Sequence, residues 1–152
     1  MFPGWVIELT AAMGEMIRMR QEHGGSVLLA VEVEPSRVSN YGVFDVEATD
    51  DDRVKKVVGM VEKPAVGDES SNLVATRRYL FDCAIFGALR RITPGRGGEL
   101  QLTDDIVLLI SEGHLVHVVV HNGIRHDLVN PAVFIPASVE FGLCHPKYAS
   151  AL

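Results

Sequence analysis

The sequence of 152 residues has the length of one ordinary domain, so we expect a single core and one domain over residues 1–152. Apolar residues make up 47% and charged residues 22%, which is typical of a packed globular protein and excludes disordered, collagen-like and disulfide-stapled classes. The formal charge of −6, without a dense basic patch, argues against a nucleic-acid partner.

The first half of the sequence predicts one helix followed by three strands. Apolar residues recur at helical spacing over residues 6–22, and a pair of glycines follows as a stop signal. Residues 26–33 form a mostly apolar, β-branched run, and residues 42–46 and 54–61 flank an acidic turn. We therefore expect three strands here, with the last two paired.

The second half alternates between strands and helices. The predicted elements are a surface loop at 65–72, a strand at 75–81, a helix at 83–92, a strand at 115–120 and a helix at 133–143. This alternation predicts an α/β fold without internal repeats.

One further helix has recognisable ends. Thr103 belongs to the residue types that cap helix N-termini, and Asp104 and Asp105 would then lie in the first turn, where the helix dipole favours negative charge. Gly113 is expected to end this helix. The sequence thus predicts a helix capped by the Thr103 side chain.

Two features bear on the compartment. Cys83 and Cys144 lie far apart and lack the spacing of a metal or disulfide motif, which favours a reduced, cytoplasmic chain. The first ten residues lack a signal-peptide pattern, and no run of 18 apolar residues occurs. We therefore expect neither export nor a membrane partner.

The most informative short segment is Val61-Glu62-Lys63-Pro64, at the end of a predicted strand. A glutamate can accept hydrogen bonds from neighbouring sugar hydroxyls, and a lysine is a compact charge suited to a phosphate. Consecutive strand side chains point to opposite faces, so both can reach one ligand only if the strand bends there. The alternative is an exposed Glu-Lys pair without a ligand.

Asp127 is a second candidate, because it follows the predicted strand 115–120. A carboxylate at the carboxyl end of an α/β strand is well placed to bind Mg²⁺ together with substrate phosphate oxygens. The alternative is a turn or helix-capping aspartate before Pro131.

Other polar groups are interpreted without a ligand. His117 and His121 would share one side of a strand, but no third ligand is near, so we interpret them as core or surface histidines. The arginines that could bind an anion are interpreted as solvated; they are Arg77, Arg78, Arg90, Arg91 and Arg96.

Six short segments occur in a fixed order along the chain. They are Tyr41-Gly42-Val43-Phe44, Val61-Glu62-Lys63-Pro64, Ser71-Asn72-Leu73, Arg78-Tyr79, Gly98-Glu99-Leu100-Gln101-Leu102-Thr103-Asp104 and Gly123-Ile124-Arg125-His126-Asp127. Together they resemble the bacterial UTP–glucose-1-phosphate uridylyltransferases, also called UDP-glucose pyrophosphorylases, over about residues 6–146.

This resemblance implies a partial Rossmann-like nucleotidyltransferase fold, with a mixed sheet and flanking helices. It also implies a Mg²⁺-dependent reaction of UTP with glucose 1-phosphate that yields UDP-glucose and pyrophosphate. Carried over residue by residue, Glu62 would hold the glucose hydroxyls, Lys63 would meet the sugar phosphate and Gly42 would lie close to the sugar. Asp127 would be a metal ligand, and Lys63 and Asp127 would be the catalytic pair.

The resemblance covers only the C-terminal, sugar-phosphate part of the family. The nucleotide-binding part, with its glycine-rich loop and second metal-binding aspartate, has no counterpart in this sequence. We therefore expect a chain that is inactive alone and that exposes a strand edge and an apolar face. Such surfaces favour a homo-oligomer or capture by a complementing N-terminal half.

Local departures from the family pattern leave other functions open. Arg77 and Val129 stand where the family has glycines, and Pro136 lies in an expected helix. The alternatives to an enzyme are a non-catalytic interaction partner of a full-length enzyme and a sugar-phosphate binding module.

Overall fold

The computed structural model describes residues 4–95, 98–123 and 131–150. The chain forms two compact units, which we call the barrel unit, Ala12–Asn122, and the terminal unit, Met1–Ala11 with Gly123–Leu152. The organisation of the chain as one domain stays a prediction. No helix among the described residues is long and apolar enough to cross a membrane.

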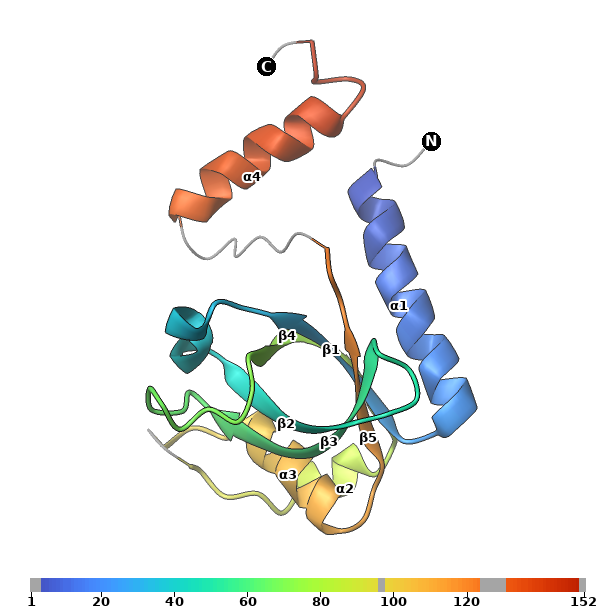
Figure 1. The fold of residues 1–152 in the computed structure, drawn as a ribbon, viewed down its shortest axis with the longest axis vertical. Helices are drawn as coiled ribbons and strands as arrows, with labels where there is room; N and C mark the ends of the chain where they lie inside the picture. Colours follow the sequence, from blue (N-terminus) through green and yellow to red (C-terminus); the bar gives the residue numbers. More distant parts are fainter. Residues whose placement is uncertain (1–3, 96–97, 124–130, 151–152) are drawn as a thin grey trace. The chain divides into compact units, whose positions relative to one another are not determined.

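The five strands of the barrel unit form one closed sheet (Figure 1). They are β1 (Ser26–Glu32), β2 (Gly42–Ala48), β3 (Val54–Glu62), β4 (Leu73–Leu80) and β5 (Val116–Val120). Their order around the barrel is β1-β4-β2-β3-β5, and β5 pairs back onto β1. The β1–β5 pair is parallel and the others are antiparallel, which confirms the predicted α/β class with a mixed sheet.

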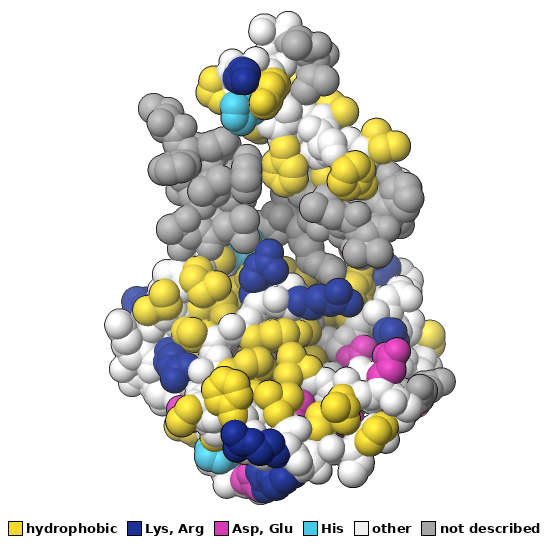
Figure 2. Space-filling model, turned by 180° about the vertical axis from the view of Figure 1, so that it is seen from behind, with side chains coloured by type: hydrophobic (Ala, Val, Ile, Leu, Met, Phe, Trp, Pro, Cys, Tyr) yellow, Lys and Arg dark blue, Asp and Glu magenta, His cyan; other side chains and the backbone are white. Residues whose placement is uncertain are grey.

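Closure of the sheet shows that the predicted open strand edge is wrong. Strand β5 lies between β1 and β3, so that Val116 faces Ser26 and Val119 faces Val54. Each strand thus has a neighbour on both sides, and β2 and β4 meet at the single pair of Val43 with Val74. Exposed apolar side chains are nevertheless present, and Figure 2 shows hydrophobic side chains gathered in the middle of one face of the barrel unit.

The helices confirm most of the predicted elements. They are α1 (Gly4–His23), the 3-10 helix η1 (Pro35–Asn40), α2 (Ile85–Leu89), α3 (Leu102–Ser111) and, in the terminal unit, α4 (Pro131–Cys144). Helix α2 is shorter than predicted because Asp82 accepts a 2.9 Å hydrogen bond from the Ala84 amide, which makes a turn of the residues before Ile85. The helix predicted at 133–143 is present as α4, and it contains Pro136.

Both faces of β1 are covered, which explains its continuous run of apolar residues. Leu28 and Ala30 pack in one cluster with Ile106 of α3, whereas Val27 and Leu29 pack in a second cluster with residues of α1. Successive strand residues point to opposite faces, so a strand between two helices is apolar at every position.

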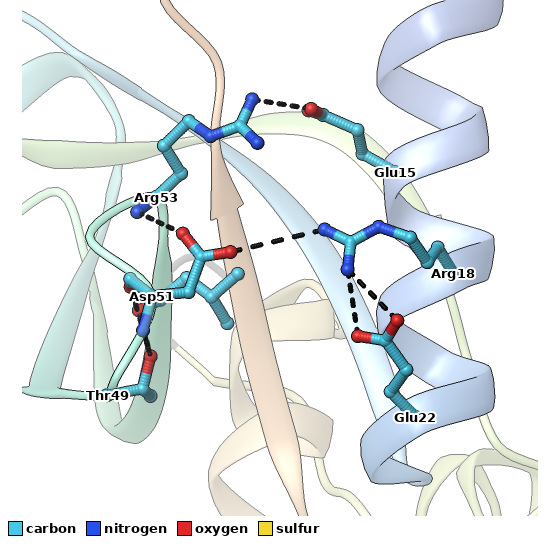
Figure 3. A network of polar contacts seen from close by, with 7 residues as sticks. Glu15, Arg18, Glu22, Thr49, Asp51 and Arg53 are labelled. Atoms are coloured by element: carbon cyan, nitrogen blue, oxygen red, sulfur yellow. Dashed lines mark hydrogen bonds and ion pairs between the residues drawn. The ribbon is translucent and has the colours of Figure 1, made fainter.

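Ion pairs attach α1 to the hairpin between β2 and β3 (Figure 3). Nη1 of Arg53 lies 2.6 Å from Oε1 of Glu15, and Nη2 of Arg18 lies 4.0 Å from Oδ2 of Asp51. Asp51 also accepts a 2.9 Å hydrogen bond from the Arg53 amide, and Thr49 donates one of 2.7 Å to the Val54 carbonyl. The acidic turn thus forms its own hydrogen bonds and holds the helix as well.

Candidate functional site

The centre of the candidate site is the open end of the β2–β3 hairpin, opposite its turn. Here Gly42, the first residue of β2, faces Glu62, the last residue of β3. A Cβ atom on Gly42 would lie 2.6 Å from Cε of Met60 and 3.0 Å from Oε2 of Glu62. The first distance is shorter than a real Cβ contact, so a larger residue here would have to move the flexible end of the Met60 side chain and would crowd the Glu62 carboxylate. Gly42 therefore lets the Glu62 carboxylate lie directly over the β2 backbone.

Thr103 joins this pair from helix α3. Its hydroxyl is buried and donates a 2.9 Å hydrogen bond to Oε2 of Glu62. The prediction that Thr103 caps α3 is wrong, because the N-cap residue is Gln101 and no side chain caps the helix. A hydroxyl serves a cap and a carboxylate equally well, so sequence reasoning missed this role.

The backbone bends at Lys63, as it must if Glu62 and Lys63 are to reach the same ligand. Strand β3 ends at Glu62, and Lys63 has a φ of +48°, in the left-handed region. Its amide donates a 3.0 Å hydrogen bond to the Tyr41 carbonyl, and Pro64 behind it is buried. Since this backbone departs from the strand pleat, the ammonium is not constrained to the face opposite Glu62. Its contact with a phosphate stays a prediction.

Tyr79 of β4 lies in the electrostatic environment of this site. Burial raises the pKa of the Tyr79 phenol, the charge of Arg77 lowers it, and the charge of Glu62 raises it. The ring packs against the core and lies 5.3 Å from the ring of Phe81. The phenol of Tyr79 thus lies within the electrostatic influence of both Arg77 and Glu62.

The metal part of the site is a prediction that the structure leaves open. Asp127 lies outside the described residues, as does Val129. Within residues 4–95, 98–123 and 131–150, no group of three His, Cys, Asp or Glu side chains could hold a metal ion. Binding of Mg²⁺ through Asp127 stays a prediction.

Two buried polar groups lie elsewhere in the barrel unit. Asp105 of α3 is fully buried, and neither carboxylate oxygen has a hydrogen-bond partner among the described residues. Burial raises the pKa of this carboxyl, with a smaller contribution from Asp104. His117 of β5 is buried with its ring 5.7 Å from that of His23, in keeping with the interpretation of a core histidine.

Comparison with known proteins decides the family. A family model described as nucleotidyl transferase matches residues 6–138. The chain belongs to the nucleotidyl transferase family. This match confirms that the six segments belong to a nucleotidyl transferase, and the barrel unit contains most of the matched residues.

The relatives of this nucleotidyl transferase chain carry a consistent name. It is 38% identical over 128 residues to the putative UTP–glucose-1-phosphate uridylyltransferase of Methanocaldococcus jannaschii, covering 84% of this chain and 44% of that protein. It is 39% identical over 137 residues to the UTP–glucose-1-phosphate uridylyltransferase of Escherichia coli K12, covering 88% and 44%.

A solved structure gives the same result. UDP-glucose pyrophosphorylase in complex with UDP-glucose matches with a TM-score of 0.79 at 29% identity, covering 86% of this chain and 48% of that one. The nucleotidyl transferase chain thus spans about half the length of the relatives it matches.

Proposed function

We propose that this nucleotidyl transferase chain binds glucose 1-phosphate at the end of the β2–β3 hairpin, as the sugar-phosphate part of a UTP–glucose-1-phosphate uridylyltransferase. The observation that carries the proposal is the Gly42–Glu62 pair, with Thr103 bonded to Oε2 of Glu62 at 2.9 Å. Among the described residues Oε1 of Glu62 accepts no hydrogen bond, so it is free to accept one from a sugar hydroxyl.

Each residue of the site has one task in this proposal. Glu62 orients the sugar ring through its hydroxyls, and Gly42 lets the ring approach the backbone. Lys63 neutralises charge on the sugar phosphate, whose oxygen attacks the α-phosphorus of UTP while pyrophosphate leaves. Such transfers depend on alignment and charge neutralisation more than on covalent chemistry of the protein.

Mg²⁺ is proposed as the cofactor, with Asp127 as a ligand. The ion would neutralise phosphate charge when bound. The tasks proposed for Glu62, Lys63 and Gly42 concern the sugar ring and its phosphate. UTP is proposed as the second substrate from the names of the relatives. A complementing nucleotide-binding part or a second copy of the chain is proposed as the partner.

Titration calorimetry with glucose 1-phosphate tests the proposal. We expect saturable binding that Lys63→Ala weakens by about 10- to 150-fold, because a hydrogen bond to a charged group contributes ~1.5–3 kcal/mol. Lys56→Ala is the matched control, since Lys56 lies on β3 seven residues before Lys63, with its Nζ 3.2 Å from Oε2 of Glu47. Equal binding by wild type and Lys63→Ala would contradict the assignment.

The closed barrel favours a second candidate function, a sugar-phosphate binding module. A sheet that pairs all its own strands needs no further strand to complete it. A pyrophosphate-release assay with UTP, Mg²⁺ and glucose 1-phosphate separates the two functions. Binding without turnover, with turnover restored by a nucleotide-binding part, supports the enzyme; binding without turnover under either condition supports the module.

A further inference from the structure

Strand β4 carries a wide irregularity directly beside the candidate site. Leu28 of β1 pairs with Tyr79, and Ala30 pairs with Ala75, so three residues of β4 lie opposite the single residue Leu29. Thr76 closes this bulge by donating a 2.9 Å hydrogen bond to the Leu29 carbonyl. Bulges re-aim side chains and occur next to functional sites.

Arg77 occupies the middle of the bulge in an unfavourable conformation. Its φ is +60°, in the left-handed region where a residue with a Cβ is strained and glycine is not. The side chain is exposed, and its guanidinium has no hydrogen bond or ion pair with any described residue. A strained backbone that presents an unpaired cation points to a functional reason for the arginine.

The strand order places Arg77 on the strand next to β2, which carries Gly42. Val43 of β2 faces Val74 of β4 on one side and Val61 of β3 on the other, so β2 lies between the two strands. Arg77 and Glu62 both act on the phenol of Tyr79, the first lowering and the second raising its pKa. Arg77 therefore follows Val74 by three residues on the strand that borders β2 next to Gly42.

We infer that Arg77 selects a sugar 1-phosphate whose ring bears a carboxylate, a hexuronate 1-phosphate, over the neutral sugar. The inference rests on the proposed function, because it assumes that Glu62 and Lys63 hold the ring and the phosphate. Lys63 already supplies a compact charge for the phosphate. A planar guanidinium matches a planar carboxylate through two parallel hydrogen bonds, whereas a neutral hydroxymethyl group leaves it unpaired.

Calorimetry with glucuronate 1-phosphate and glucose 1-phosphate tests the inference. We expect the wild-type chain to bind the uronate about tenfold or more tightly than the neutral sugar, because a paired carboxylate adds charge-assisted hydrogen bonds. Arg77→Gly and Arg77→Gln should both abolish this preference and leave glucose 1-phosphate binding unchanged. Arg78→Ala, which removes a neighbouring exposed charge from the same bulge, is the matched control and should keep the preference.

The outcomes separate the two proposals. Arg77→Gly should also melt at a higher temperature than wild type, because glycine relieves the left-handed strain, so loss of binding through misfolding is detected directly. Equal binding of both ligands by wild type, or an equal loss of both in the Arg77 variants, would overturn the role of Arg77 and leave the proposed function standing. Absence of binding of either ligand to wild type would overturn both.

Discussion

The hydroxyl of Thr103, in the first turn of α3, lies 2.9 Å from Oε2 of Glu62, at the last position of β3. The two residues are distant in the sequence, and their bond ties a helix end to a strand end. It fixes one oxygen of a carboxylate on an otherwise exposed side chain. A ligand that uses Glu62 therefore meets a carboxylate with a set orientation.

Thr103→Val tests this positioning role. Valine has nearly the same shape but cannot donate, so the Glu62 carboxylate loses its fixed orientation. We expect glucose 1-phosphate affinity to fall about 3- to 12-fold and the free energy of unfolding to fall by ~0.5–1.5 kcal/mol, the contribution of one hydrogen bond. Calorimetry and urea denaturation measure the two effects. Thr103→Ser restores the donor and should recover the affinity; a Thr103→Ser variant as weak as Thr103→Val would argue against positioning.

Gly42→Ala should disturb the same carboxylate from the β2 side. The new Cβ would lie 2.6 Å from Cε of Met60 and 3.0 Å from Oε2 of Glu62, so the end of the Met60 side chain must move and the Glu62 carboxylate is displaced slightly. We expect a destabilisation of at most about 1 kcal/mol, the lower end for overpacking, because both atoms are the ends of flexible side chains, together with weaker glucose 1-phosphate binding. Gly59→Ala is the matched control in the same hairpin, because its Cβ would meet nothing closer than Cβ of Asp45 at 3.4 Å. Comparable losses in both variants would contradict a specific role of Gly42.

The individual strands and helices could be predicted from the sequence, because each is a local pattern of apolar spacing and turn residues. The closure of the sheet could not be predicted, because the apolar pattern of Ser26–Glu32 predicts a strand but not the strands with which it pairs. Pairing of β1 with both β4 and β5 depends on residues far away in the sequence. The family resemblance led to the opposite expectation of an open edge.

The residues of the candidate site that are close in the sequence could be predicted, and those that tertiary contacts bring together could not. Glu62 and Lys63 stand in one short segment, and their chemistry could be recognised there. The role of Thr103 depends on a tertiary contact with Glu62, whereas the local sequence predicts only that its hydroxyl caps a helix. The left-handed backbone at Arg77 follows from the bulge in β4, which the sequence does not signal through any glycine.

Asp105→Ala should stabilise the barrel unit at neutral pH. The buried carboxylate has no partner among the described residues, and removing an unsatisfied buried polar group recovers ~1–3 kcal/mol. Asp104→Ala is the matched control, because Asp104 is exposed in the same helical turn and should change stability little.

The difference in stability between wild type and Asp105→Ala should depend on pH. Because burial raises the pKa of Asp105, the folded chain keeps the proton to a higher pH than the unfolded chain, which loses it near pH ~4. Wild-type stability should therefore fall, relative to Asp105→Ala, as the pH rises above that value. Urea denaturation across this range measures it, and a constant difference between the two proteins would contradict the assignment.

His117 should make the barrel unit sensitive to acid. Burial, and then the charges of His23 and Lys56, lower the pKa of the His117 imidazole. The unfolded chain takes up a proton near pH ~6.5 and the folded chain only at a lower pH, so stability is lost as the pH falls through this window. His117→Gln should flatten the fall measured by denaturant titration. His121→Gln, a change at a partly exposed histidine just after β5, should not.

The parallel pair of β1 with β5 also bears on how the barrel unit folds. Ser26 pairs with Val116, although the two strands lie near opposite ends of the unit's sequence. The chain segment that this contact closes contains nearly every other element. Contacts of such long range are formed late and slow the search for the native state. On the ribosome, β1 and β3 can have their final neighbours only after Val120 has emerged from the exit tunnel. Until then both present unpaired backbone groups, so the window for misassembly is set by the time taken to translate α2, α3 and β5.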